Sequence, residues 1–238
     1  MNRQLSRLLA LQELNNKIAD CRNNIDALNA SVKNKREEVE LAREKIGEIK
    51  EEIKRNKKEE DRRELDLKSN EGDINKLLIQ LNQAKSNDEY SALNKRIEEE
   101  RRQDSALEDE ILELMASSDG LKARTEELQK SVAVLEDELS GMEKKAGIDV
   151  AAFEKEIDEL QNRAREIEAE IDPDLIDKYR RLFERKLGDV MAVADEVALV
   201  CKGCNMSVPR QLINEILKDD AIVFCKSCNR ILYIPEKE

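Results

Sequence analysis

Apolar residues recur every seven positions over most of this 238-residue sequence, and this repeat constrains the fold more than any other feature. Two apolar positions in each heptad are typical of coiled-coil helices that pack along a narrow seam. In the N-terminal part, the first seam contains Leu11, Ile18, Ile25, Val32, Val39, Ile46 and Ile53 and resumes in phase at Leu67, Ile74 and Leu81, while a companion seam contains Leu14, Cys21, Leu28, Ala42 and Ile49. The sequence therefore predicts one long helix with a partner helix along it.

A second series of heptads predicts a second long helix. Its main seam contains Leu93, Leu107, Leu114, Leu121, Leu128, Leu135 and Met142. Between the two series, residues 84–90 are rich in Ser, Asn and Asp, and Ser86 with Glu89 matches a capping box at a helix start. We therefore expect a turn near residues 85–90.

Polar positions within the seams favour an antiparallel hairpin over one uninterrupted helix in a parallel dimer. If the chain folds back at Asn87, polar Asn56 faces polar Ser118 and apolar Leu77 faces apolar Ile97. The fold class predicted is mainly α, with an antiparallel coiled-coil hairpin over residues 1–171. The seams leave open whether two hairpins pair into a homo-oligomer.

Residues 54–63 form a mixed-charge stretch in which three seam positions are occupied by Asn56, Glu60 and Arg63. Charge runs usually form a solvated helix face. The alternative is that this stretch forms a hinge or a docking site for a partner.

Four cysteines near the C-terminus form two C-x2-C pairs separated by twenty residues: Cys201, Cys204, Cys225 and Cys228. This spacing is typical of a zinc site, because each pair can direct two thiolates to one point and four thiolates complete a closed tetrahedron. The prediction is one structural Zn²⁺. Cys21 stands alone far upstream, and we interpret it as a small apolar core residue.

The cysteines belong to a predicted second domain, residues 172–238, in which a short helix precedes a small β zinc ribbon. The helix extends from Pro173 to Leu187 and is followed by Gly188 as a stop signal. Short apolar runs predict strands at 190–194, 197–200, 221–224 and 231–234, with a helical insert at 207–217.

The composition argues against an enzyme. Charged residues make up 40% of the chain, aromatic residues 3%, and there is neither His nor Trp. No phosphate-binding glycine loop occurs, and the carboxylates are spaced as solvated helix faces. The C-x2-C pairs could cycle between dithiol and disulfide, but two pairs at this spacing favour a metal.

The amphipathic start of the chain lacks the apolar core of a signal peptide or membrane span, so we expect a cytoplasmic protein.

The arrangement resembles a bacterial family of long coiled-coil hairpins that end in a four-cysteine zinc ribbon. The most specific residues are Asn87-Asp88-Glu89-Tyr90-Ser91-Ala92-Leu93 at the hairpin tip and the two cysteine pairs with their flanking residues. The resemblance implies a non-enzymatic adaptor or chaperone, because members in flagellar biogenesis and chlamydial secretion bind a sigma factor, and one associates with flagellin messenger RNA. Expected partners are therefore a sigma factor or secretion or flagellar components, with no membrane partner.

The alternative function is RNA or DNA binding by the ribbon and its adjacent helix. To bind the phosphates of a nucleic-acid backbone, a protein needs clustered Lys and Arg side chains. The chain has a formal net charge of −12, and residues 172–238 carry 11 Lys or Arg against 12 Asp or Glu, so any such site must be a local patch. The candidate residues are Arg180, Arg181, Arg185, Lys186, Lys202, Arg210, Lys226 and Arg230.

Overall fold

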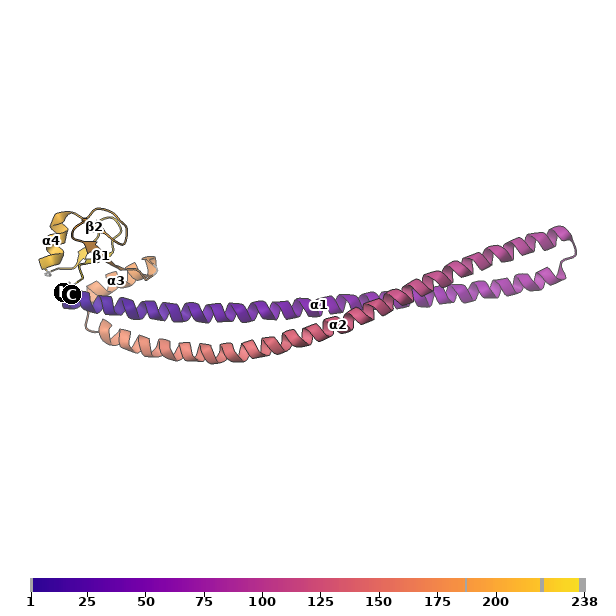
Figure 1. Ribbon diagram of the computed structural model, residues 1–238, viewed down its shortest axis with the longest axis horizontal. Helices are drawn as coiled ribbons and strands as arrows, with labels where there is room; N and C mark the ends of the chain where they lie inside the picture. The colour runs from indigo at the N-terminus through magenta and orange to yellow at the C-terminus, as the bar shows by residue number, and fades with distance from the viewer. Residues whose placement is uncertain (1, 187, 219–220, 236–238) are drawn as a thin grey trace. The chain divides into compact units, whose positions relative to one another are not determined.

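The computed structural model describes residues 2–186, 188–218 and 221–235 (Figure 1). The elements, in chain order, are α1 (Arg3–Gln83), α2 (Asn87–Glu168), α3 (Pro173–Lys186), β1 (Met191–Asp195), β2 (Val200–Cys201), α4 (Arg210–Lys218), β3 (Val223–Phe224) and β4 (Ile231–Tyr233). Two helices of 81 and 82 residues are thus followed by a small C-terminal sheet. This order confirms the predicted class, a mainly α hairpin with a β region at its end.

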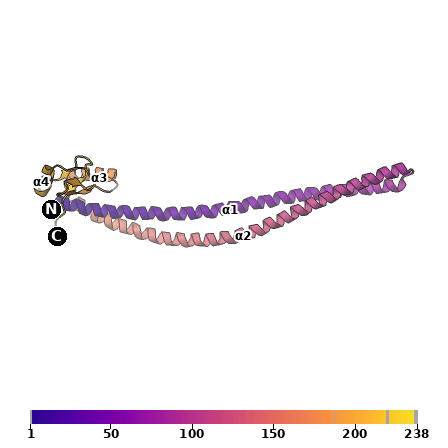
Figure 2. The ribbon, with the colours of Figure 1, turned by 45° about the horizontal axis from the view of Figure 1, so that its top comes forward.

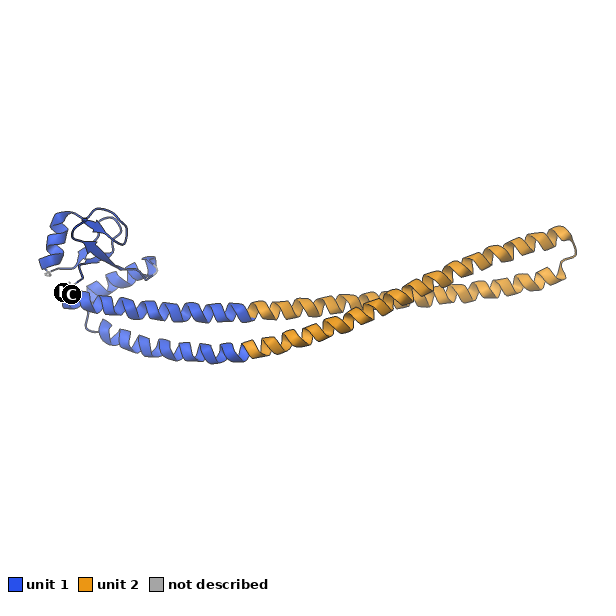
Figure 3. Ribbon diagram, in the orientation of Figure 1, with its two compact units in different colours: residues 1–32, 143–238 blue, residues 33–142 orange. Residues whose placement is uncertain are grey.

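The chain divides into two compact units (Figure 3). Unit 1 comprises residues 1–32 and 143–238, and unit 2 comprises residues 33–142. Helices α1 and α2 each contribute to both units. The predicted domain boundary at residues 171 and 172 lies in the connection between α2 and α3.

In unit 2, α1 and α2 run side by side in opposite directions (Figure 1, Figure 2). Near the turn, Ile74 and Leu77 of α1 form one apolar cluster with Ile97 of α2, and Leu81 and Leu93 pack against it. The antiparallel seam pairing predicted for Leu77 and Ile97 is therefore confirmed. Burial of these seams against each other stabilises the pair, because each helix alone leaves an apolar stripe in water.

A capping box begins α2. The hydroxyl oxygen of Ser86 accepts a hydrogen bond of 3.2 Å from the Glu89 backbone N–H, and the Glu89 carboxylate accepts one of 3.2 Å from the Lys85 N–H. Both bonds satisfy N–H groups that have no partner within the helix. Because α2 already includes Asn87, the connection between the helices is shorter than the predicted 85–90 turn.

A polar layer interrupts the seams of unit 2. The amide of Asn56 donates a hydrogen bond of 3.2 Å to the hydroxyl of Ser117, which neighbours the predicted partner Ser118. Ser118 is buried, and its hydroxyl has no hydrogen-bond partner among the residues described. Glu60 is only 7% exposed and pairs with Lys57 at 2.8 Å. Residues 54–63 are therefore not uniformly solvated.

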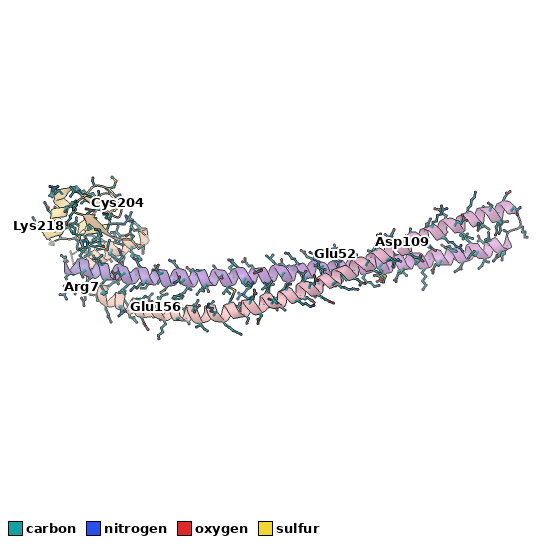
Figure 4. All side chains as sticks on the ribbon, in the orientation of Figure 1. Arg7, Glu52, Asp109, Glu156, Cys204 and Lys218 are labelled. Carbon is teal, nitrogen blue, oxygen red and sulfur yellow. The ribbon has the colours of Figure 1, made fainter. Side chains whose placement is uncertain are left out.

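In unit 1, the start of α1, the end of α2, α3 and the sheet share one apolar core. Its buried residues are Leu5, Leu8, Leu11, Ala164, Ile171, Ile176, Tyr179, Leu182, Val190, Met191 and Ile231. The side-chain oxygen of Gln12 accepts hydrogen bonds from the backbone N–H groups of Val190 at 2.9 Å and Met191 at 2.7 Å. Arg7, labelled in Figure 4 at the start of α1, pairs with Glu170 just after α2. Within this unit, the start of α1 is therefore fixed to the polypeptide that enters β1.

The sheet has the strand order β2-β1-β4-β3. β1 is parallel to β4 and antiparallel to β2, and β3 is antiparallel to β4. The predicted strand at 197–200 is wrong over most of its length, because only Val200 belongs to β2. The carboxylate of Asp195 accepts hydrogen bonds from the N–H groups of Val197 and Ala198 and closes a turn there. Val197 is consequently 88% exposed.

Candidate metal centre

The ribbon brings the four predicted cysteines together. All four Sγ atoms lie within 4.8 Å of one another. Cys201 Sγ lies 3.9 Å from Cys228 Sγ, and Cys204 Sγ lies 3.8 Å from Cys225 Sγ. Cys201 and Cys225 are buried, while Cys204, labelled in Figure 4, and Cys228 are partly exposed.

These separations fit a tetrahedral zinc site. With Zn–S bonds of about 2.3 Å, the sulfurs of a regular tetrahedron are about 3.8 Å apart. Two of the six sulfur–sulfur distances, 3.8 and 3.9 Å, agree with that value, and all six are within 4.8 Å. Four sulfur donors leave no coordination position for a substrate, so the geometry is that of a closed, structural site.

Both cysteine pairs are followed by an asparagine, giving the sequences Cys-Lys-Gly-Cys-Asn and Cys-Lys-Ser-Cys-Asn. The N–H of Asn205 donates to the Cys201 carbonyl at 2.7 Å, and the N–H of Asn229 donates to the Cys225 carbonyl at 2.9 Å. Both asparagines have positive φ, 58° and 62°. Asn tolerates this left-handed conformation better than most residues. The Asn after each pair is therefore a sequence signal for these knuckles that the cysteine spacing alone does not give.

The thiols differ in how readily they ionise. Burial raises the pKa of Cys201 to about 12, although hydrogen bonds from the Gly203 and Cys204 backbone N–H groups favour its thiolate. Burial also opposes ionisation of Cys228, but the Arg230 backbone N–H, the neighbouring thiols and the Arg230 guanidinium together lower its pKa to about 7. A metal binds thiolates, so zinc loading of this site releases protons.

Three of the eight predicted basic residues have acidic partners. Arg180 pairs with Glu168 at 2.7 Å, Lys202 pairs with Asp195 at 2.9 Å, and Arg230 pairs with Asp189 at 2.8 Å. Arg230 also has only 14% of its side chain exposed. In contrast, no ion pair of Arg181, Arg185, Lys186, Arg210 or Lys226 is found in the described ranges of the chain.

Two of these cations line a groove beside the metal centre. The groove has a volume of about 400 Å³, and it is lined by Lys178, Arg181, Leu182, Arg185, Phe224 and Asn229. It therefore joins one face of α3 to the end of β3 and to the second cysteine knuckle. The sequence indicated the basic face of α3. In contrast, Asn229 joins the lining of this groove only when the ribbon is folded.

The fold and the cysteine cluster define the class of protein as a helical hairpin that carries a four-cysteine ribbon. Comparison with known families agrees: residues 200–232 match a C4-type zinc ribbon domain, and residues 2–187 match the CT398-like coiled coil hairpin domain. The chain belongs to the CT398-like coiled-coil hairpin family. Both matched families are structural domains rather than enzyme families.

Solved structures share this architecture. CT398 from Chlamydia trachomatis is 25% identical, with 98% of each chain covered and a TM-score of 0.86. The HP0958 protein from Helicobacter pylori is 18% identical, with 98% of each chain covered and a TM-score of 0.73. A protein from Mycobacterium smegmatis is 19% identical over 96% of this chain and 97% of its own, with a TM-score of 0.58. No curated protein matches this chain.

The resemblance to a family of coiled-coil hairpins with zinc ribbons is thereby confirmed. Among the helices in the part of the chain that the structure describes, none combines the length and apolar character needed to cross a membrane.

Proposed function

We propose that this protein is a zinc-stabilised adaptor without enzymatic activity, which presents its hairpin and ribbon to protein partners. The observation that carries the proposal is the packing of unit 1, where α1, α2, α3 and the ribbon share one core. A ribbon fixed in this way to helix ends is suited to holding binding surfaces in a defined arrangement. The matched families support an interaction role.

One Zn²⁺ held by Cys201, Cys204, Cys225 and Cys228 is part of this proposal. The ribbon has few large apolar residues, and metal binding contributes roughly 10–16 kcal/mol of apparent free energy to folding in small zinc peptides. When bound, zinc crosslinks the two knuckles and supplies no reaction chemistry. We place the protein in the cytoplasm, where thiols stay reduced and available to metal.

The partner classes that family resemblance implies are an alternative sigma factor and components of a flagellar or secretion apparatus. A direct test uses the zinc-loaded full chain as bait in extracts of its native host, with and without nuclease, followed by titration of the purified sigma factor. Saturable, nuclease-resistant binding of a sigma factor or apparatus component supports the adaptor. Failure of the purified candidates to bind the zinc-loaded chain contradicts it.

Nucleic-acid binding is the second candidate function, and the cations that line the groove favour it. Arg181 and Arg185 have no ion pair among the residues described, and Phe224 offers an aromatic ring beside them. Single strands bind through phosphates to such cations and through base stacking to aromatic rings. Recovery of RNA, with proteins lost after nuclease treatment, would favour this function over the adaptor.

A further inference from the structure

The groove beside the metal centre has an ordered arrangement of charge. Lys178, Arg181 and Arg185 are spaced by three and four residues along α3, so they lie on one face of the helix. At about 1.5 Å per residue, these three cations extend over roughly 10 Å. The opposite side of α3 is anchored, because Ile176 and Tyr179 are buried in the unit 1 core. The cationic face is thus held in place.

These cations are also available for binding. All three are exposed, and within the described ranges none forms an ion pair. Their neighbour Arg180 differs, because Glu168 and Asp177 lie 2.7 and 3.9 Å from its guanidinium. Three of the four α3 cations without an ion pair in the described ranges therefore line the groove, and the fourth is Lys186 at the end of the helix.

The other residues that line the groove carry apolar side chains or a side-chain amide. The partly buried ring of Phe224 contributes an apolar surface, whereas Leu182, which also borders the groove, is buried in the unit 1 core. The exposed side chain of Asn229 makes no hydrogen bond to any residue the structure describes, so its amide can both donate to a ligand and accept from one. An occupant that complements this groove carries several negative groups and at least one apolar side chain.

Charge around the groove favours a short acidic peptide over a nucleic acid. A nucleic acid binds along a track of cations that neutralises successive phosphates. Of the other candidate cations, Arg180, Lys202 and Arg230 are already paired with carboxylates, and Lys186, Arg210 and Lys226, for which no ion pair is found in the described ranges, do not line the groove. The rest of residues 172–238 offers no net positive charge to a longer polyanion, because this region carries 11 Lys or Arg against 12 Asp or Glu. A compact cationic face of roughly 10 Å matches two or three carboxylates instead.

We propose that this groove binds an acidic linear segment of a protein partner, with its carboxylates on Lys178, Arg181 and Arg185 and an apolar side chain against Phe224. Arginine forks suit this role because they bind carboxylates through two parallel hydrogen bonds. The inference rests on the proposed adaptor function and assigns it a contact surface.

The test measures fluorescence anisotropy of short labelled peptides with the zinc-loaded full chain. One peptide has Asp and Glu around a single Phe, a second has Ala in place of Phe, and a single-stranded RNA of about twelve nucleotides covers the alternative. The variant is Arg181→Ala with Arg185→Ala. The matched control, Arg210→Ala with Lys226→Ala, removes the same charge from two exposed, unpaired positions outside the groove. Zinc content is measured for every protein.

We expect the Phe-containing peptide to bind about tenfold or more weakly to the groove variant, because the variant lacks the two guanidinium groups that hold the peptide carboxylates. The control should bind nearly as wild type, and the Ala peptide more weakly than the Phe peptide. Equal losses in both double variants, or groove-dependent binding of the RNA alone, overturn the proposal. If partner binding survives in the groove variant, the adaptor function stands and this assignment of its surface is wrong.

Discussion

The guanidinium of Arg230 donates a hydrogen bond of 2.6 Å to the backbone carbonyl of Gly203. It donates a second bond of 2.8 Å to the Asp189 carbonyl and forms an ion pair with the carboxylate of the same residue. Arg230 follows the second cysteine knuckle, whereas Gly203 lies within the first. The side chain therefore ties the two halves of the metal centre together, and it is only 14% exposed.

Replacing Arg230 with Ala should weaken zinc binding. The substitution removes hydrogen bonds that orient both knuckles, and loss of such supporting contacts typically lowers metal affinity about 10–100-fold. Competition against a chromophoric chelator measures the change. Lys226→Ala, an exposed substitution in the second knuckle, is the control and should retain wild-type affinity. Equal affinities of the Arg230 and Lys226 variants would show that the bridge has no part in metal binding.

Zinc removal should unfold the ribbon and leave the long helices folded. The helices of 81 and 82 residues depend on their seams, whereas the ribbon depends on the metal. On addition of a chelator, we expect far-ultraviolet circular dichroism to change little while limited proteolysis begins within residues 190–235. Cys225→Ser should show this pattern without a chelator, and Cys21→Ala should retain full zinc content. An unchanged proteolysis pattern in Cys225→Ser would mean that the metal is dispensable for folding.

The hairpin was predictable from the sequence because its signals are local or periodic. Heptad spacing placed Leu77 opposite Ile97, and the Ser86–Glu89 capping box placed the start of α2. The strand at 197–200 was predicted wrongly, because apolar spacing does not reveal that the Asp195 side chain closes a turn. A short side-chain hydrogen bond there outweighs the β propensity of Val197.

The four cysteine ligands of the candidate metal centre were predictable from the sequence, but the contacts around them were less so. Two C-x2-C pairs predict that Cys201 and Cys225 approach each other, and the structure brings their pairs together. The pairing of Arg230 with Gly203 depends on a parallel β1–β4 contact between distant segments. Counting cations in a sequence does not show which are already paired, so Arg230 was placed among the nucleic-acid candidates. Its low exposure is a property of the folded sheet alone.

Gly188 should be intolerant of substitution, unlike Gly147. Gly188 lies two positions after the last residue of α3 and has a φ of 91°, and its N–H donates to the Phe183 carbonyl at 3.1 Å. A Cβ there would lie 2.5 Å from Asn16 Oδ1. Gly188→Ala should therefore lower the free energy of unfolding of unit 1 by about 1 kcal/mol or more. Gly147 lies within α2 with open space around it, so Gly147→Ala should stabilise the helix by about 0.5–1 kcal/mol. Hydrogen exchange of amides in each helix measures both effects, and equal responses would contradict the prediction.

Alkaline pH should loosen unit 1 through Tyr179. Burial raises the pKa of the Tyr179 hydroxyl to about 12, against the opposing effect of the Asn15 amide that donates to it at 3.3 Å. Because the folded pKa exceeds the ordinary value of about 10, the folded state retains its proton longer than the unfolded state. The resulting stabilisation is complete below about pH 10 and is lost as the pH rises toward 12.

The measurement is the thermal midpoint of unit 1 between neutral pH and pH values in that alkaline range. Tyr179→Phe removes the titrating group, so its midpoint should fall less steeply with pH than that of the wild type. Parallel pH dependence in the two proteins would show that Tyr179 does not control alkaline stability. The difference in phenolate absorbance between the wild type and Tyr179→Phe provides an independent titration of Tyr179, because the chain also contains Tyr90 and Tyr233.

Ser118→Ala should stabilise the polar layer of unit 2. Its hydroxyl is buried without a hydrogen-bond partner among the described residues, and such a group costs about 1–3 kcal/mol. Alanine removes that cost and improves helix propensity. Ser117→Ala is the matched control, because it has the same propensity gain but loses the exposed hydrogen bond from Asn56. We expect Ser118→Ala to exceed Ser117→Ala by about 1 kcal/mol in the local opening free energy of residues 111–125, measured by native-state hydrogen exchange. Lower protection in Ser118→Ala would instead show that the hydroxyl has a stabilising partner in solution, and the layer would then be a satisfied network rather than a local weakness in the seam.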